Sequence, residues 1–97
     1  MVDYEIVDFE QTQYYSAAVV VVKITDDYKE RYRFTFPATY SRKMVEDHLS
    51  AILERMVTSW DDDAGVFFYD PHYIDIFHID DEGEYQATTV VVDRLLK

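Results

Sequence analysis

The sequence predicts one α+β domain, with an antiparallel sheet of about five to six strands and one amphipathic helix packed on it. Three observations support this fold class. Strand-like segments occur on both sides of a helical pattern, that helical pattern occurs only once, and no internal repeat or linker divides residues 1–97. The predicted order is β-β-β-α-β-β-β, in which the last strand pair forms a hairpin.

The first two strands are predicted over residues 2–10 and 13–25. In the first, apolar residues alternate with acids as far as Ile6, and the phase then shifts to Val7 and Phe9, which indicates a β-bulge. The second contains the unbroken apolar run AAVVVV, which is typical of a strand that is covered on both faces.

The third strand is predicted over residues 29–36, which follow a turn around Asp26 and Asp27. Its period of two is clean. Glu30 and three aromatic residues occupy one face, and Lys29, Arg31 and Arg33 give the opposite face a basic character. Pro37 ends the strand.

Residues 41–60 predict the helix. Apolar residues recur at helical spacing, while charged and polar residues fill the opposite side. The apolar positions are Val45, Leu49, Ile52, Leu53, Met56, Val57 and Trp60. Ser41 or Thr39 can cap the start of the helix, and Gly65 is a plausible stop.

Three short strands are predicted after the helix, over residues 66–69, 72–79 and 84–93. The last two form a hairpin across the turn Asp80-Asp81-Glu82-Gly83. One helix covers only one face of such a sheet, so the doubly apolar strands imply cover for the other face. A homodimer, a partner protein or curling of the sheet would each provide this cover.

Composition excludes several classes of protein. The chain has no cysteine, which removes disulfide scaffolds and thiolate zinc sites, and only two glycines, which rules out phosphate-binding loops. No apolar stretch is long enough to span a membrane, and the acidic N-terminus does not resemble a signal peptide. We therefore expect a cytoplasmic protein, in the host cytoplasm if the chain is viral.

No catalytic or metal-binding pattern stands out. Asp70, His72, Asp75 and His78 lie close together in the sequence, but on one strand Asp75 points away from the two histidines. The serines lack a nucleophile-elbow context, and carboxylate pairs are expected by chance in so acidic a chain. The sequence predicts no enzyme, no metal and no cofactor.

Charge is the most informative feature. Twenty acidic and nine basic residues give a net charge of −11, so direct binding to nucleic acid or anionic membranes is not expected, whereas basic partners are attracted. The acids are segregated, since residues 61–93 carry ten acids and no Lys or Arg. The block Asp61-Asp62-Asp63 also follows the predicted helix, where acids oppose the helix dipole.

Where a sequence departs from local rules without a structural gain, function is a reasonable suspect. We therefore expect both ends of the chain to form one continuous anionic surface that imitates nucleic-acid phosphates, flanked by aromatic anchors. The predicted partner-binding residues are Asp3, Glu5, Trp60, Asp61, Asp62, Asp63, Asp80, Asp81, Glu82 and Glu84.

In size, cysteine-free composition, acidity and segregated charge, the chain resembles the small acidic phage-encoded inhibitors that mimic DNA and block CRISPR or restriction complexes. The resemblance involves no shared motif. It implies binding to a CRISPR effector or restriction enzyme, without cofactor or turnover.

Other interpretations remain open from the sequence alone. An immunity or antitoxin protein would neutralise a basic nuclease toxin through the same acidic patch. A structural or assembly protein would use its acidity only to stay soluble, and adaptation to high salt produces similar surfaces.

Overall fold

The computed structural model describes residues 2–79 and 81–95, and of residues 78, 79 and 85–87 it describes the backbone. It confirms the predicted α+β class, with one helix, a five-stranded antiparallel sheet and a small two-stranded sheet. The elements are β1 (Tyr4–Gln11), β2 (Tyr15–Thr25), β3 (Tyr28–Pro37), α1 (Arg42–Thr58), β4 (Trp60–Asp61), β5 (Val66–Phe67), β6 (Tyr73–Ile79) and β7 (Tyr85–Leu95).

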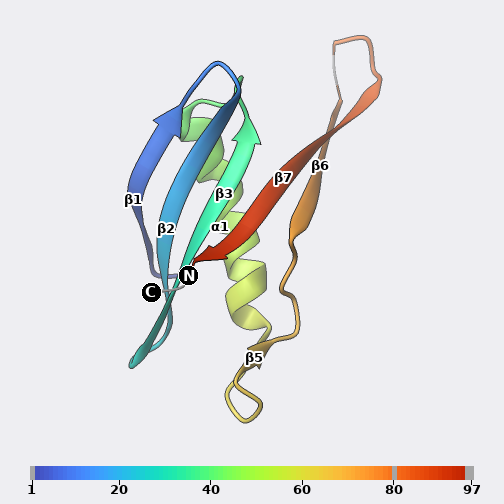
Figure 1. Ribbon diagram of the computed structural model, residues 1–97. Coiled ribbons are helices and arrows are strands. Elements are labelled where there is room, and N and C mark those ends of the chain that lie inside the picture. The colour runs from blue at the N-terminus through green and yellow to red at the C-terminus, as the bar shows by residue number, and fades with distance from the viewer. Residues whose placement is uncertain (1, 80, 96–97) are drawn as a thin grey trace.

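The large sheet has the strand order β1-β2-β3-β7-β6 (Figure 1). β7 pairs with β3 through Arg31–Thr35 and with β6 along most of its length. Because only the C-terminal half of β7 lies against β3, the β6–β7 hairpin extends well beyond the end of β3 (Figure 1). This register gives the molecule its elongated shape, with a longest extent of 47 Å.

The bulge predicted in the first strand is confirmed, because the register of β1 against β2 shifts between Ile6 and Asp8. The extra residue lets both Ile6 and Phe9 face the core, while Val7 is left 45% exposed. The apolar phase shift was therefore read correctly as a bulge, but Val7 itself lies outside the core.

α1 begins after Ser41, whose hydroxyl accepts a hydrogen bond from the backbone N–H of Met44 at 3.3 Å. Ser41 is thus the N-cap, one of the two residues that the sequence offered. The apolar stripe packs on the sheet, and its buried members are Val45, Leu49, Ile52, Leu53 and Met56. The helix ends at Thr58, two residues before the predicted end.

β3 alternates as predicted, with Tyr32, Phe34 and Phe36 almost fully buried and Lys29 and Arg31 exposed. Glu30 also faces inward, and its side chain is only 8% exposed. Its carboxylate forms an ion pair with Arg94 of β7 and accepts a hydrogen bond from the Tyr28 hydroxyl. This pairing allows an acid to occupy a buried position.

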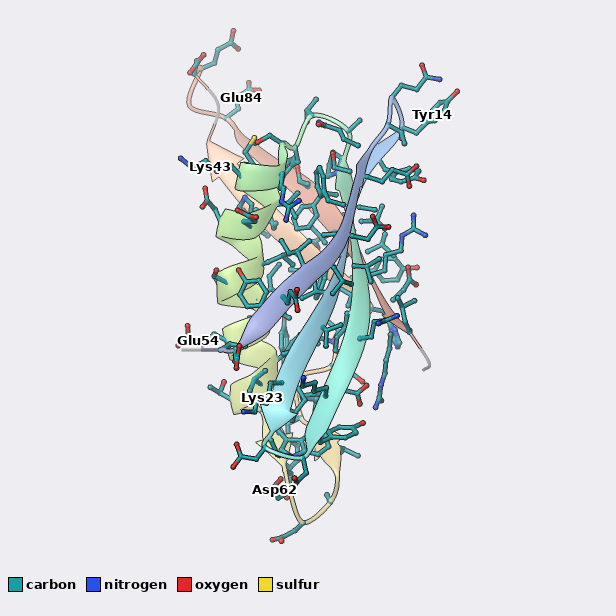
Figure 2. The ribbon with its side chains drawn as sticks, turned by 90° about the vertical axis from the view of Figure 1, so that its left-hand side faces the viewer. Tyr14, Lys23, Lys43, Glu54, Asp62 and Glu84 are labelled. Carbon is teal, nitrogen blue, oxygen red and sulfur yellow. The ribbon has the colours of Figure 1, made fainter. Side chains whose placement is uncertain are left out.

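The fold has two layers, a sheet and the helix that covers one of its faces (Figure 2). β2 and β3 are the most buried strands, and both are interior strands of the large sheet (Figure 1). Within the described residues, no helix is both long and apolar enough to cross a membrane.

Candidate partner-binding surface

The segment after the helix differs from the prediction. Trp60 is not part of the helix; with Asp61 it forms β4, which pairs with Val66 and Phe67 of β5. Gly65 lies in the turn of this hairpin with φ of 67°, so it serves the hairpin and not the helix end. The spacing of Trp60 in the sequence fits the apolar stripe of the helix. In the structure, Trp60 instead pairs with Phe67, so the helix ends two residues before the predicted end.

Two of the three aspartates that follow the helix have local roles in this hairpin. The Asp61 Oδ1 atom accepts hydrogen bonds from the backbone N–H groups of Asp63 at 2.9 Å and Ala64 at 3.2 Å. The Asp62 Oδ1 atom accepts a hydrogen bond from the Trp60 indole N–H at 2.6 Å. Aspartate commonly stabilises turns in this way. The expectation that this acidic block brings no structural gain was wrong.

An aromatic contact joins this hairpin to the turn between β2 and β3. The Trp60 indole stacks on the Tyr28 ring with centroids 5.5 Å apart, and it meets the Phe67 ring edge-on at 4.9 Å. The contact brings together two acidic turns that are more than thirty residues apart in the sequence. We call this surface the acidic end, and it comprises Asp26, Asp27, Asp61, Asp62 and Asp63.

One lysine pairs with the acidic end, because Lys23 lies 3.5 Å from Asp26. Two arginines are engaged elsewhere, since Arg94 pairs with the buried Glu30 and the Arg55 guanidinium lies 4.1 Å from the Tyr69 ring centroid. Within the described part of the chain, neither Asp27 nor the three hairpin aspartates form an ion pair. The acidic end thus presents a strongly negative local surface.

The N-terminal acids lie near the same end but in a different environment. Asp3 and Glu5 line a surface hollow of about 290 Å³ together with Asp26 and two lysines, Lys23 and Lys29. The backbone N–H of Lys23 donates to the Asp3 carbonyl at 2.9 Å. The lysines offset part of the negative charge here, so Asp3 and Glu5 extend the acidic end only weakly.

The acids of the last hairpin do not join this surface. Figure 2 places Asp62 at one end of the molecule and Glu84 at the other. Asp81 and Glu82 belong to the same turn as Glu84, whereas Asp80 lies outside the described residues. The expected continuous anionic surface is therefore absent from the described structure, because the register between β7 and β3 directs the hairpin tip away from the acidic end.

The structure also reveals an exposed aromatic residue that sequence reasoning missed. Phe68 follows β5 and is 79% exposed, whereas its neighbour Phe67 is buried against Trp60. Trp60 itself is half-buried and stabilises the hairpin from within. Strand alternation could have signalled that one of two successive phenylalanines faces solvent. Phe68, and not Trp60, is the aromatic side chain of this hairpin that is open to a partner.

Among the described residues, the histidine-containing segment offers no assembled site. The His72 carbonyl accepts a hydrogen bond from the Val92 N–H at 2.8 Å, and the side chain of His78 lies outside the described residues. Among the residues that are described, no group of three or more His, Asp or Glu side chains is arranged to hold a metal ion.

Comparison of the chain with protein-family models, with curated proteins and with solved structures found no match.

Proposed function

We propose that this protein is a non-enzymatic inhibitor that binds a nucleic-acid-binding protein at its cationic groove and blocks access of the nucleic acid. The observation that supports the proposal most directly is the Tyr28–Trp60 stack, which unites five aspartates from two turns at one end of the molecule. This end replaces the continuous surface that the sequence suggested.

The acidic end has the chemistry that a cationic groove selects. Lysine and arginine side chains that normally contact phosphates are attracted to a cluster of carboxylates, and the attraction acts over a Debye length of about 8 Å at physiological ionic strength. Charge sets the rate and orientation of association, while an exposed aromatic side chain supplies buried contact area. Phe68 provides such a side chain beside the aspartates.

The proposed partners are basic proteins inside cells, such as CRISPR effectors or restriction enzymes. We therefore propose that the protein acts in the cytoplasm, and in the host cytoplasm if it derives from a virus. The inhibitor needs no cofactor, and it does not bind nucleic acid directly, because its net charge of −11 repels phosphates.

The test is affinity capture from a bacterial lysate with the immobilised protein, at low and at high salt. We expect a basic nucleic-acid-binding protein to be retained at low salt, to elute as the salt rises, and to be displaced by added duplex DNA. Retention that DNA does not displace would contradict the proposed mode of inhibition. Capture of a nuclease toxin would identify the protein as an immunity factor instead.

Two matched variants locate the surface. The variant Asp61→Asn/Asp62→Asn/Asp63→Asn removes three charges but keeps side-chain oxygens that accept the hydrogen bonds of the turn. We expect it to lose capture at least tenfold. The control Asp81→Asn/Glu82→Gln/Glu84→Gln removes three charges at the opposite end and should capture normally. An equal loss in both variants would show that total charge, and not the acidic end, determines binding.

A further inference from the structure

The face of the sheet that α1 leaves uncovered carries an ordered pattern of charge. Three neighbouring strands differ in chemistry, since β1 presents acids, β2 presents small apolar residues and β3 presents bases. We call this surface the helix-free face; on these three strands it includes Glu5, Asp8 and Glu10, then Ala17, Val19, Val21 and Lys23, then Lys29, Arg31 and Arg33. Figure 2 shows this side of the sheet turned away from the helix.

The strand register places the charges level with one another. Val21 pairs with Glu5 on one side and with Arg31 on the other, and Val19 pairs in the same way with Asp8 and Arg33. Each acid is therefore separated from one arginine by a valine and by two strand spacings, or about 10 Å. The ion pairs found within the described residues join neither Glu5 to Arg31 nor Asp8 to Arg33.

The part of the helix-free face formed by β1, β2, β3 and β7 is also close to electrically neutral, unlike the molecule as a whole. Over β1, β2, β3 and β7 its outward charged residues are four acids and four bases, namely Glu5, Asp8, Glu10, Asp93, Lys23, Lys29, Arg31 and Arg33. The whole chain has a net charge of −11, so two copies repel each other over most of their surfaces. This face is where a second copy can approach with the least repulsion.

We infer that two copies of this chain associate through their helix-free faces, related by a two-fold axis parallel to β2. This rotation lays β1 of one copy over β3 of the other and β2 over β2. Glu5 then faces Arg31 of the second copy and Asp8 faces its Arg33, and the symmetry repeats both contacts. Val19 and Val21 of the two copies meet at the centre, as in an aligned packing of two sheets.

The charge pattern selects this axis over the alternative. A two-fold axis perpendicular to the strands would lay β1 over β1 and β3 over β3, which opposes acids to acids and arginines to arginines. A surface hollow of about 230 Å³, lined by residues that include Asp8, Val19 and Arg33, lies on the same face and can receive side chains from the second copy. The orientation of the two copies thus follows from the order of acidic, apolar and basic residues on β1, β2 and β3.

The contact area indicates a weak dimer. Three overlapping strands, β1, β2 and β3, spaced about 4.8 Å apart and some eight residues long, give a footprint on the order of 400 Å² per copy. Stable interfaces bury about 800 Å² per partner, so the dimer belongs with small, transient interfaces. We expect dissociation in the micromolar range or weaker. The inference does not depend on the acidic end, of which Asp26 borders this face.

The test is a charge exchange measured by sedimentation velocity over a concentration series. The unaltered chain should shift from 11.6 kDa towards twice that mass as the concentration rises. Arg31→Glu/Arg33→Glu should be monomeric because it opposes acids to acids, and Glu5→Arg/Asp8→Arg should be monomeric because it opposes bases to bases. An equimolar mixture of the two variants should dimerise again, since the acidic β1 and β3 of one variant then face the basic β3 and β1 of the other.

The control is Arg42→Glu/Lys43→Glu at the exposed start of α1, which changes the net charge as much as Arg31→Glu/Arg33→Glu does and should dimerise like the unaltered chain. Circular dichroism checks that each variant is folded. The inference is overturned if the unaltered chain stays at 11.6 kDa at the highest concentration, or if the mixed variants fail to associate. Capture by the acidic end should survive in Arg31→Glu/Arg33→Glu, which separates the two proposals.

Discussion

The Trp60 indole lies against the Tyr28 phenol ring, with centroids 5.5 Å apart and planes inclined by 28°. Tyr28 opens β3 and Trp60 opens β4, so this one contact connects the large sheet to the small one. The arrangement of the acidic end depends on it, because the two aspartate-bearing turns share no other aromatic contact among the described residues.

Replacing Tyr28 with leucine should loosen this connection. Stacked aromatic pairs contribute about 0.5–1.5 kcal/mol beyond their buried area, so we expect a loss of stability of about 1 kcal/mol. Trp60 is the single tryptophan of the chain, and its fluorescence should become more accessible to the neutral quencher acrylamide. Tyr28→Phe keeps the ring and serves as the control. Equal quenching in both variants would mean that the stack does not shield the indole.

The ion pair between Glu30 and Arg94 predicts a strong asymmetry between single and double variants. In Arg94→Met the carboxylate of Glu30, whose side chain is 8% exposed, loses its cation. Removing one partner of a fully buried pair typically costs about 3–5 kcal/mol, and we expect roughly 2 kcal/mol here because Arg94 is half exposed.

The double variant Glu30→Leu/Arg94→Met should recover much of that loss, because it leaves no unpaired charge in the core. Urea denaturation monitored by circular dichroism measures both. A double variant that is less stable than Arg94→Met alone would show that Glu30 stabilises the fold even without Arg94, through its hydrogen bond from the Tyr28 hydroxyl.

Tyr32 carries a buried hydroxyl for which the described structure provides no hydrogen-bond partner. Tyr32→Phe removes this unsatisfied group without changing the ring, so we expect stability at neutral pH to be unchanged or higher by about 1 kcal/mol. Thermal unfolding at pH 7 is the measurement. A clear loss of stability would reveal a partner for the hydroxyl, such as a buried water molecule.

The same residue predicts a response to alkaline pH. Burial, with a contribution from the charge on Glu30, raises the pKa of Tyr32 above its ordinary value of 10.0. In the unfolded chain Tyr32 ionises near pH 10, whereas in the folded chain it stays protonated. Its contribution to stability is therefore present below pH 10 and is lost as the pH rises further, by up to about 1.4 kcal/mol per pH unit. In Tyr32→Phe the decline above pH 10 should be shallower, and an unchanged slope would contradict the assignment.

Asp61 should stabilise the hairpin because its side-chain oxygen accepts hydrogen bonds, and not because the side chain is charged. Asp61→Ala removes the acceptor for two backbone N–H groups, and we expect a loss of about 1 kcal/mol. Asp61→Asn keeps an acceptor oxygen and should stay within about 0.5 kcal/mol of the unaltered chain. Chemical denaturation distinguishes the two. If both variants were destabilised equally, the carboxylate charge would be the stabilising feature.

Sequence patterns correctly predicted the elements in which the spacing of apolar residues matches the side chains that are buried in the structure. The alternation in β3 placed even Glu30 on the correct face, and the phase shift in β1 located the bulge. The prediction failed at Trp60, where helical spacing continues past the point at which the backbone turns into a hairpin with Phe67. A residue at that spacing fits either element, and only its pairing partner decides between them.

The sequence by itself determined the rows of charge along the strands, because a period of two assigns each side chain to a face without reference to distant residues. It could not determine where those strands and turns meet. The pairing of β7 with β3 sends Glu84 to one end of the molecule, and the packing of Trp60 on Tyr28 gathers Asp26 and Asp62 at the other. Both contacts join residues that are far apart in the chain. They depend on which long-range pairing buries the most apolar surface, and that pairing is decided only when the whole core assembles.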